Sequence, residues 1–295
     1  MAVKAGYGLL RRIARLLALY ARMDLLLLTR DPLMTAGWAI TDLVINLASV
    51  SGLLLLAQRF AGIGTWSRPS FVFMLGYASL VEGLVATLFG YNVSHISRRI
   101  GRGQLDHSLL QPQPLWIVLL TEGFSPAFGA PALLPGTLLL IWGWRMLPQA
   151  PWAAFRSMGH GCGALAWSGL FVLDMASSVV VVMAFQYGWG SLAFWSPRAS
   201  EELNTSTHDL LSTLKSFPLN AMSPILRFGL LSIIPAGFVG WAPVAGLLQI
   251  GHIWFLITPA AALISAAAAA IVFKAGLKHY GKTGSQRYSA FGHRS

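Results

Sequence analysis

The feature that most restricts this chain is a series of apolar runs, each about as long as a membrane is thick. A helix needs about 20 apolar residues to cross the hydrocarbon core. We expect six such spans, at 35–57, 70–91, 128–146, 160–195, 225–240 and 252–273. Since 55% of the residues are hydrophobic and only 11% are charged, a soluble protein is excluded. The sequence predicts an all-α integral membrane protein, with residues 1–295 forming one domain.

Residues 1–33 are predicted to form an interfacial helix that lies in the plane of the membrane. At about 100° per residue, its basic side chains fall on one arc and its leucines lie mostly opposite. The basic residues are Lys4, Arg11, Arg12, Arg15 and Arg22. A second interpretation extends the helix into a first span, but Asp24, Arg30 and Asp31 bracket that short apolar run. A cleaved signal peptide is not expected, because no cleavage site of small residues follows the basic stretch.

The distribution of basic residues predicts the orientation in the membrane. With the N-terminus, 93–113, 197–227 and the tail at 274–295 assigned to the cytoplasm, 17 of the 21 Lys and Arg lie inside. Short loops rich in Lys and Arg are retained on the cytoplasmic side. We therefore expect a multi-pass protein with both termini in the cytoplasm, and a re-entrant segment at 242–250 that enters the outer leaflet without crossing it.

The loop 93–114, VSHISRRIGRGQLDHSLLQPQP, is a basic interruption between apolar runs. Gly103, Leu105, Leu109 and Leu110 are arranged as a short amphipathic turn, which the prolines at 112 and 114 would end. We interpret this segment as a handle that another protein grips. The alternative is an ordinary cytoplasmic loop.

Four acidic residues lie in or beside apolar runs, namely Asp42, Glu82, Glu122 and Asp174. Charges at membrane depth are costly and often mark transport paths. Asp42 and Glu122 are close enough to the inner interface to stay hydrated, so Glu82 and Asp174 are the principal candidates. An interhelical hydrogen bond or a protonated carboxyl that fixes packing is the alternative explanation.

Enzyme chemistry is not expected. Residues 276–283 match the phosphate-binding pattern G-x-x-x-x-G-K-T, but a working loop of this kind joins a buried strand to a helix, and here it follows a membrane helix. The histidines are scattered and Cys162 is the only cysteine, so no metal-ligand spacing or catalytic set is present. The basic residues gather at the ends of apolar runs, which favours lipid headgroups over nucleic acid as partners.

Three stretches together resemble the membrane subunits of type-2 ATP-binding cassette (ABC) exporters, in the six-span permease subfamily long catalogued as a domain of unknown function. They are IGRGQLDHSLLQPQP, the region from AFWS at 193–196 through SFPLNAMSPILRFGLLSIIPAGFVGWAPV, and FKAGLKHYGKTGS. The chain departs from the subfamily pattern at Gln104, Phe217 and Lys282.

This resemblance implies a permease that couples to a dimer of separate cytoplasmic ABC ATPases, which would bind ATP and Mg²⁺, so that this chain itself carries no cofactor. It implies a second permease subunit, either the same chain or a paralogue, and a location in the bacterial inner membrane. The implied ATPase-coupling residues are Arg98, Arg99, Arg102, Gly103, Leu105, Asp106, Leu109 and Leu110. Trp38, Asp42, Glu82 and Asp174 are candidates for the translocation path.

Two other functions remain open from the sequence. A proton-coupled secondary transporter would use Glu82 or Asp174 as its carrier carboxyl, although no inverted repeat of broken helices is evident. A non-transporting membrane scaffold would form a stable complex without ATP-dependent flux. The residues do not identify a substrate, because fold-level analogy does not choose among the cargoes of related exporters.

Overall fold

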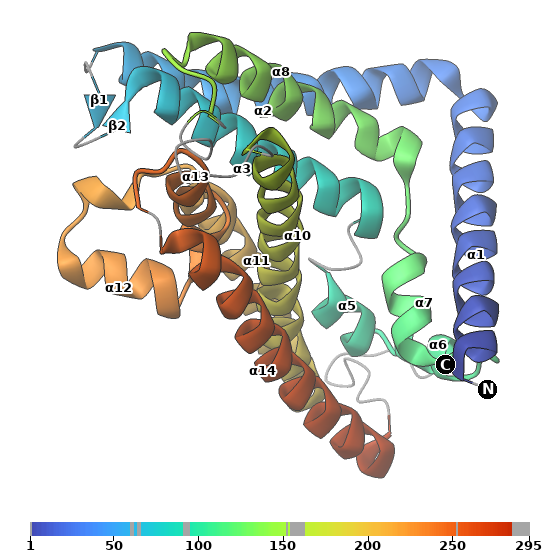
Figure 1. The fold of residues 1–295 in the computed structure, drawn as a ribbon. Coiled ribbons are helices and arrows are strands. Elements are labelled where there is room, and N and C mark those ends of the chain that lie inside the picture. The colour runs from blue at the N-terminus through green and yellow to red at the C-terminus, as the bar shows by residue number, and fades with distance from the viewer. Residues whose placement is uncertain are drawn as a thin grey trace.

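The computed structural model describes residues 2–59, 62–63, 66–90, 95–151, 153, 163–251 and 253–284. The described chain is almost entirely helical (Figure 1). The long helices are α1 (Ala2–Arg30), α2 (Pro32–Arg59), α3 (Arg68–Phe89), α8 (Pro126–Met146), α10 (Gly163–Gly190), α11 (Pro197–Leu214) and α14 (Trp254–Thr283). The short ones are α5 (Ile96–Gly101), α6 (Leu105–Leu109), α7 (Leu115–Thr121), η1 (Ser191–Phe194), η2 (Leu219–Ala221), α12 (Pro224–Ser232), η3 (Pro235–Phe238) and α13 (Trp241–Leu247). Strands β1 (Gly62–Ile63) and β2 (Trp66–Ser67) pair antiparallel.

The corner between α1 and α2 is set by two residues. Asp31 lies between the helices, and its Oδ1 accepts a hydrogen bond from the Met34 amide at 3.1 Å, which caps the start of α2. Pro32 is the first residue of α2, a position where its missing N–H costs nothing. From this corner α1 runs down one edge of the molecule, away from α2 (Figure 1).

Helices α3 and α8 form a tight antiparallel hairpin through glycines that recur every seven residues on both. The glycines are Gly76, Gly83 and Gly90 on one side and Gly129, Gly136 and Gly143 on the other. A Cβ added to Gly136 would lie 2.5 Å from the Leu80 nitrogen, and one on Gly83 would lie 2.8 Å from the Ala132 carbonyl oxygen. Because small residues let helix backbones approach closely in membranes, this hairpin is packed backbone against backbone.

Helices α10 and α14 run parallel to each other. Tyr187 of α10 packs on Phe273 of α14 with ring centroids 6.0 Å apart, and seven residues later in each segment Phe194 of η1 packs on Tyr280 of α14 at 5.7 Å. Since both helices point the same way, the intervening chain must return to the start of α10. Helix α11 makes this return: it begins beside the end of α10 and ends where its Lys215 carbonyl closely approaches Gly240.

The predicted fifth span, 225–240, is wrong as a continuous helix. Helix α12 ends at Ser232, and the following η3–α13 segment is bent from it by 71°. Pro235 begins the second piece, and its lack of an N–H and its ring prevent the first helix from continuing. Residues 197–227, expected as a polar cytoplasmic segment, contain the helix α11 and the start of α12.

The remaining predicted elements can be compared directly with the helices. Among the described residues, four helices are long and apolar enough to cross a membrane, namely α2, α3, α10 with η1, and α14, and the bent pair of α12 with η3–α13 would make a fifth if it were one span. Together with α8 the four helices coincide with the expected spans to within a few residues, except that α14 continues ten residues into the expected tail. The predictions for residues 1, 91, 93–94, 160–162, 252 and 285–295 concern positions outside the described residues.

Candidate functional site

The predicted handle consists of two short helices, α5 and α6, joined at Gly103. This glycine has a φ of +70°, and its amide donates to the Ile100 carbonyl at 3.1 Å while the Gln104 amide donates to that of Arg99 at 3.0 Å. This pair of bonds is the Schellman arrangement, which favours glycine at the left-handed position. The turn ends α5 and redirects the chain, so that α6 lies beside α7.

The apolar side of the handle is divided between the interior and the surface. Leu105 is completely buried, in a cluster with Ile96, Phe194 and Tyr280. Leu110 is 83% exposed and Leu109 is also exposed. The interpretation of all three leucines as one docking face is therefore corrected, because Leu105 anchors α6 to the body of the protein and only the other two are accessible.

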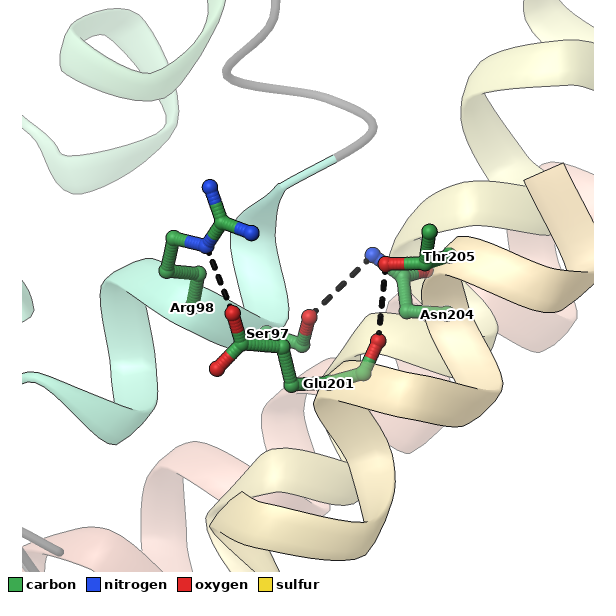
Figure 2. Close-up of polar contacts among 5 residues, drawn as sticks. All are labelled: Ser97, Arg98, Glu201, Asn204 and Thr205. Carbon is green, nitrogen blue, oxygen red and sulfur yellow. Dashed lines mark hydrogen bonds and ion pairs between the residues drawn. The ribbon is translucent and has the colours of Figure 1, made fainter. Parts of the chain in front are cut away.

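Polar contacts join α5 to α11 (Figure 2). The Arg98 Nε donates to the Glu201 carboxylate at 2.6 Å, and the Asn204 amide donates to the Ser97 hydroxyl at 3.2 Å. The ion pair is partly exposed, whereas Ser97 and Asn204 are both buried. Two bonds one helical turn apart fix both the position and the rotation of α5 on α11.

Further contacts hold the handle to α7 and α14. The Arg99 guanidinium pairs with Glu122, which follows α7, and also donates to Ser108 at 2.6 Å. The Tyr280 hydroxyl of α14 donates to the Asp106 carboxylate at 2.5 Å. The eight predicted coupling residues therefore divide into two groups. Five serve internal contacts, namely Arg98, Arg99, Gly103, Leu105 and Asp106, and three face outward, namely Arg102, Leu109 and Leu110.

The N-terminal helix α1 is joined to the same region. Burial, with Glu122 as a further cause, raises the pKa of the Tyr20 phenol, while Arg99 opposes the shift. One turn further, buried Asp24 accepts hydrogen bonds from the Ser125 hydroxyl at 2.8 Å and the Ala127 amide at 2.6 Å. Asp24 thereby caps α8 from another helix, where a carboxylate also interacts favourably with the helix dipole.

A cavity of about 720 Å³ lies between α2, α3, α8 and α11. Trp38, Asp42 and Glu82, the three residues assigned to the path on α2 and α3, all line it. His208 of α11 lines the same cavity, as do Arg30 and Asp31 at the α1–α2 corner. The structure therefore brings together side chains that are up to 178 residues apart in the sequence.

Glu82 is held by two residues near the end of α11. The Lys215 ammonium pairs with its carboxylate, and the Ser212 hydroxyl donates to it at 3.1 Å. The Lys215 side chain is only 7% exposed, whereas that of Glu82 is 39% exposed. A cation so deeply buried needs its counter-ion, so this pair links α11 firmly to the α3–α8 hairpin.

Asp174, the fourth candidate, does not belong to this cavity. It is fully buried in α10, and its carboxylate has no hydrogen-bond partner within the described part of the chain. One turn away, Ser178 bonds to Tyr77 at 3.1 Å and donates to the Phe238 carbonyl at 2.9 Å. Asp174 thus lies in the apolar core that supports α13.

The sequence analysis missed the inward face of α11. The polar residues of this face recur every three or four positions and contact other helices or line the cavity. They are Glu201, Asn204, His208, Ser212 and Lys215. A search for apolar periodicity overlooks this segment, because the repeating residues are polar. The same search made with polar residues would have identified it.

Comparison with known proteins identifies the family. The model of the ABC-2 family transporter proteins matches residues 43–284. The chain belongs to this family. It is thus a permease component of ABC-2 type transport, and members of the family are not themselves the catalytic subunit. No curated protein and no solved structure gives a match, and the described residues contain no group of three or more metal-ligating side chains.

Proposed function

We propose that this ABC-2 family chain is the membrane-spanning permease of an ATP-driven exporter, with α11 as its fifth crossing. The parallel direction of α10 and α14 supports this, because a crossing between them returns the chain to the outer side. At 18 residues, α11 is roughly 27 Å long, close to the thickness of the hydrocarbon core. Helices α2, α3, α8, α10, α11 and α14 then make six crossings, with α12 and α13 re-entrant on the outer side.

The outward face of α11 supports its assignment to the translocation path. This face is polar and exposed, with Glu202, Thr205, Ser206, Asp209 and Thr213. Charged side chains facing lipid are costly, so the face requires water or protein beside it. Two permeases, whether two copies of this chain or a copy and a paralogue, that place their α11 helices opposite each other would enclose an aqueous path.

One continuous series of contacts carries the proposal. The exposed tip of the handle, with Arg102, Leu109 and Leu110, docks on a separate cytoplasmic ABC ATPase dimer that binds ATP and Mg²⁺. Displacement of α5 passes to α11 through Arg98 and Glu201, and from the far end of α11 through Lys215 to Glu82 in the cavity. ATP binding in the partner can thereby reshape the cavity without any catalytic group in this chain.

The revised topology keeps the orientation expected for a bacterial inner membrane. Lys215 now lies within the membrane and Arg227, in α12, lies on the outer side. Fifteen Lys and Arg remain in the cytoplasm against five outside, which still favours cytoplasmic termini.

The decisive experiment purifies the chain from its native membranes in mild detergent and assays the recovered complex for ATP hydrolysis. We expect a soluble ATPase to accompany the wild-type chain and to be lost on Leu110→Asp. Thr283→Asp, which places the same charge on an exposed position at the cytoplasmic end of α14 outside the handle, is the matched control and retains the ATPase. Leu105→Asp instead lowers the yield of folded permease. Absence of any ATPase from the wild-type preparation would contradict the proposal and favour a scaffold or a proton-coupled carrier.

The topology is tested separately by cysteine labelling. In a Cys162→Ala background, Ser232→Cys in α12 reacts with a membrane-impermeant maleimide applied from outside. Leu110→Cys reacts only after the membrane is permeabilised. Labelling of Ser232→Cys from the cytoplasmic side alone would refute α11 as a crossing.

A further inference from the structure

We infer that the cavity beside α2 binds an amphipathic organic cation, whose charge is met by Asp42 and whose apolar body lies against Trp38. This inference deepens the proposed function, because it names the class of substrate. It rests on three independent features of the cavity, which are its position, its lining and its charge.

The position of the cavity suits an amphiphile that enters from the lipid. Leu27, at the end of α1, and Met34, at the start of α2, both line it and are both more than half exposed. The cavity therefore reaches the surface at the α1–α2 corner. Because α1 is amphipathic with an exposed basic face, it lies at the level of the lipid headgroups, so the opening faces the inner leaflet at its interface with water.

The lining is largely apolar with a few convergent polar groups. Trp38, Met34, Val85 and Ala132 supply apolar surface, and a volume of about 720 Å³ is in the range of small-molecule sites. The indole of Trp38 is also the side chain that attracts a cation most strongly to its ring face. Within the described chain, the His208 Nδ1 is buried without a hydrogen-bond partner, so one polar atom in this wall remains unsatisfied.

The charge of the lining selects a cation. Arg30 and Asp31 offset each other in formal charge, and Glu82 is neutralised by Lys215. Asp42 forms no ion pair with any Lys, Arg or His within the described residues. One carboxylate thus remains uncompensated in an apolar cavity, where an opposite charge interacts more strongly than in water.

The test measures equilibrium binding of two probes of the same shape and opposite charge, tetraphenylphosphonium and tetraphenylborate. The purified permease complex is placed in nanodiscs of zwitterionic lipid, and no ATP is present. We expect the phosphonium to bind at least tenfold more tightly than the borate. Asp42→Asn should weaken phosphonium binding at least tenfold, and Asp42→Glu should restore most of it. Trp38→Ala should weaken the binding of both probes.

The matched control is Asp174→Asn, which removes one carboxyl group from the core of α10, outside the cavity. It should leave phosphonium binding unchanged. Equal affinity for the two probes, or an equal loss in Asp42→Asn and Asp174→Asn, would overturn the inference. These outcomes can be distinguished from those that test the proposed function. If the ATPase is recovered but phosphonium binding does not depend on Asp42, only the substrate class is refuted. If binding depends on Asp42 but no ATPase is recovered, only the exporter function is refuted.

Discussion

The glycine heptads of α3 and α8 allow a quantitative test of the fold. In Gly136→Ala, the new methyl carbon would lie 2.5 Å from the Leu80 nitrogen, whereas ordinary contacts begin at 3.4 Å. The two backbones would have to separate by about 0.9 Å. Such overpacking typically lowers the free energy of unfolding by about 1–3 kcal/mol. Part of this loss arises because helices that are held apart lose dispersion contacts along their interface.

Gly169→Ala in α10 is the matched control, because nothing lies within 4 Å of its added Cβ. Both substitutions gain the same helix propensity, about 1 kcal/mol, so their difference isolates the cost of packing. We measure thermal unfolding in nanodiscs by the fluorescence of the 11 tryptophans. At about 2–4 °C per kcal/mol for a chain of this size, Gly136→Ala should melt on the order of 2–12 °C below the control.

The double variant Gly83→Ala/Gly136→Ala extends this test. Both methyl groups force the same two helices apart, so the second is accommodated partly by the separation that the first has produced. The loss of unfolding free energy in the double variant should therefore be smaller than the sum of the losses in the two single variants, by about 0.5 kcal/mol or more. Equal melting temperatures for Gly136→Ala and Gly169→Ala, or strictly additive losses, would refute the close packing of the hairpin.

Three other predictions concern carboxylates of α1, α3 and α10. Asp24→Ala should lower stability by about 1–2 kcal/mol through loss of the α8 cap and make α1 more sensitive to limited proteolysis; an unchanged digestion pattern would contradict the cap. Glu82→Gln should lower the free energy of unfolding by about 1–3 kcal/mol, which is less than the loss for a fully buried ion pair because Glu82 is partly exposed. Adding Lys215→Gln should restore the melting temperature. An unchanged melting temperature in Glu82→Gln alone would show that the pair does not stabilise the fold. Asp174→Asn should preserve stability and ATP-driven flux, because an unpaired buried carboxyl is itself costly; abolished flux would favour the proton-coupled carrier.

The apolar spans of this fold are predictable because burial in lipid requires long apolar runs. The positions of α2, α3, α8 and α10 and the start of α14 follow from this requirement alone, whereas the end of α14 lies ten residues beyond its apolar run. Helix α11 could not be found in this way, since its polar side chains are satisfied by α5 and α3, which lie far away in the sequence. The capping of α8 by Asp24 was equally inaccessible, because it depends on how α1 turns at Asp31.

The candidate site was predictable in part for a similar reason. Asp42 and Glu82 could be selected because charged residues in apolar runs are costly, and Trp38 was selected through the family resemblance. Their convergence on one cavity required the α3–α8 hairpin. The regular spacing of glycines at 76, 83 and 90 and at 129, 136 and 143 is visible in the sequence, and heptads of small residues indicate a helix contact, so this pairing was within reach of sequence reasoning.

The packing of the two helix pairs suggests where ATP-driven motion would act. The α3–α8 hairpin leaves no room for sliding, because its backbones are in contact along its length. Helix α11, by contrast, is attached to the hairpin through Lys215 and Ser212, which both bind Glu82, and to the handle through Glu201 and Asn204. A pull on α5 would therefore move α11 relative to a rigid hairpin, and the ion pair at Glu82 lies where the two meet. Since Glu82 also lines the cavity, rearrangement of the pair is the step at which motion of the handle would change the affinity for a bound molecule.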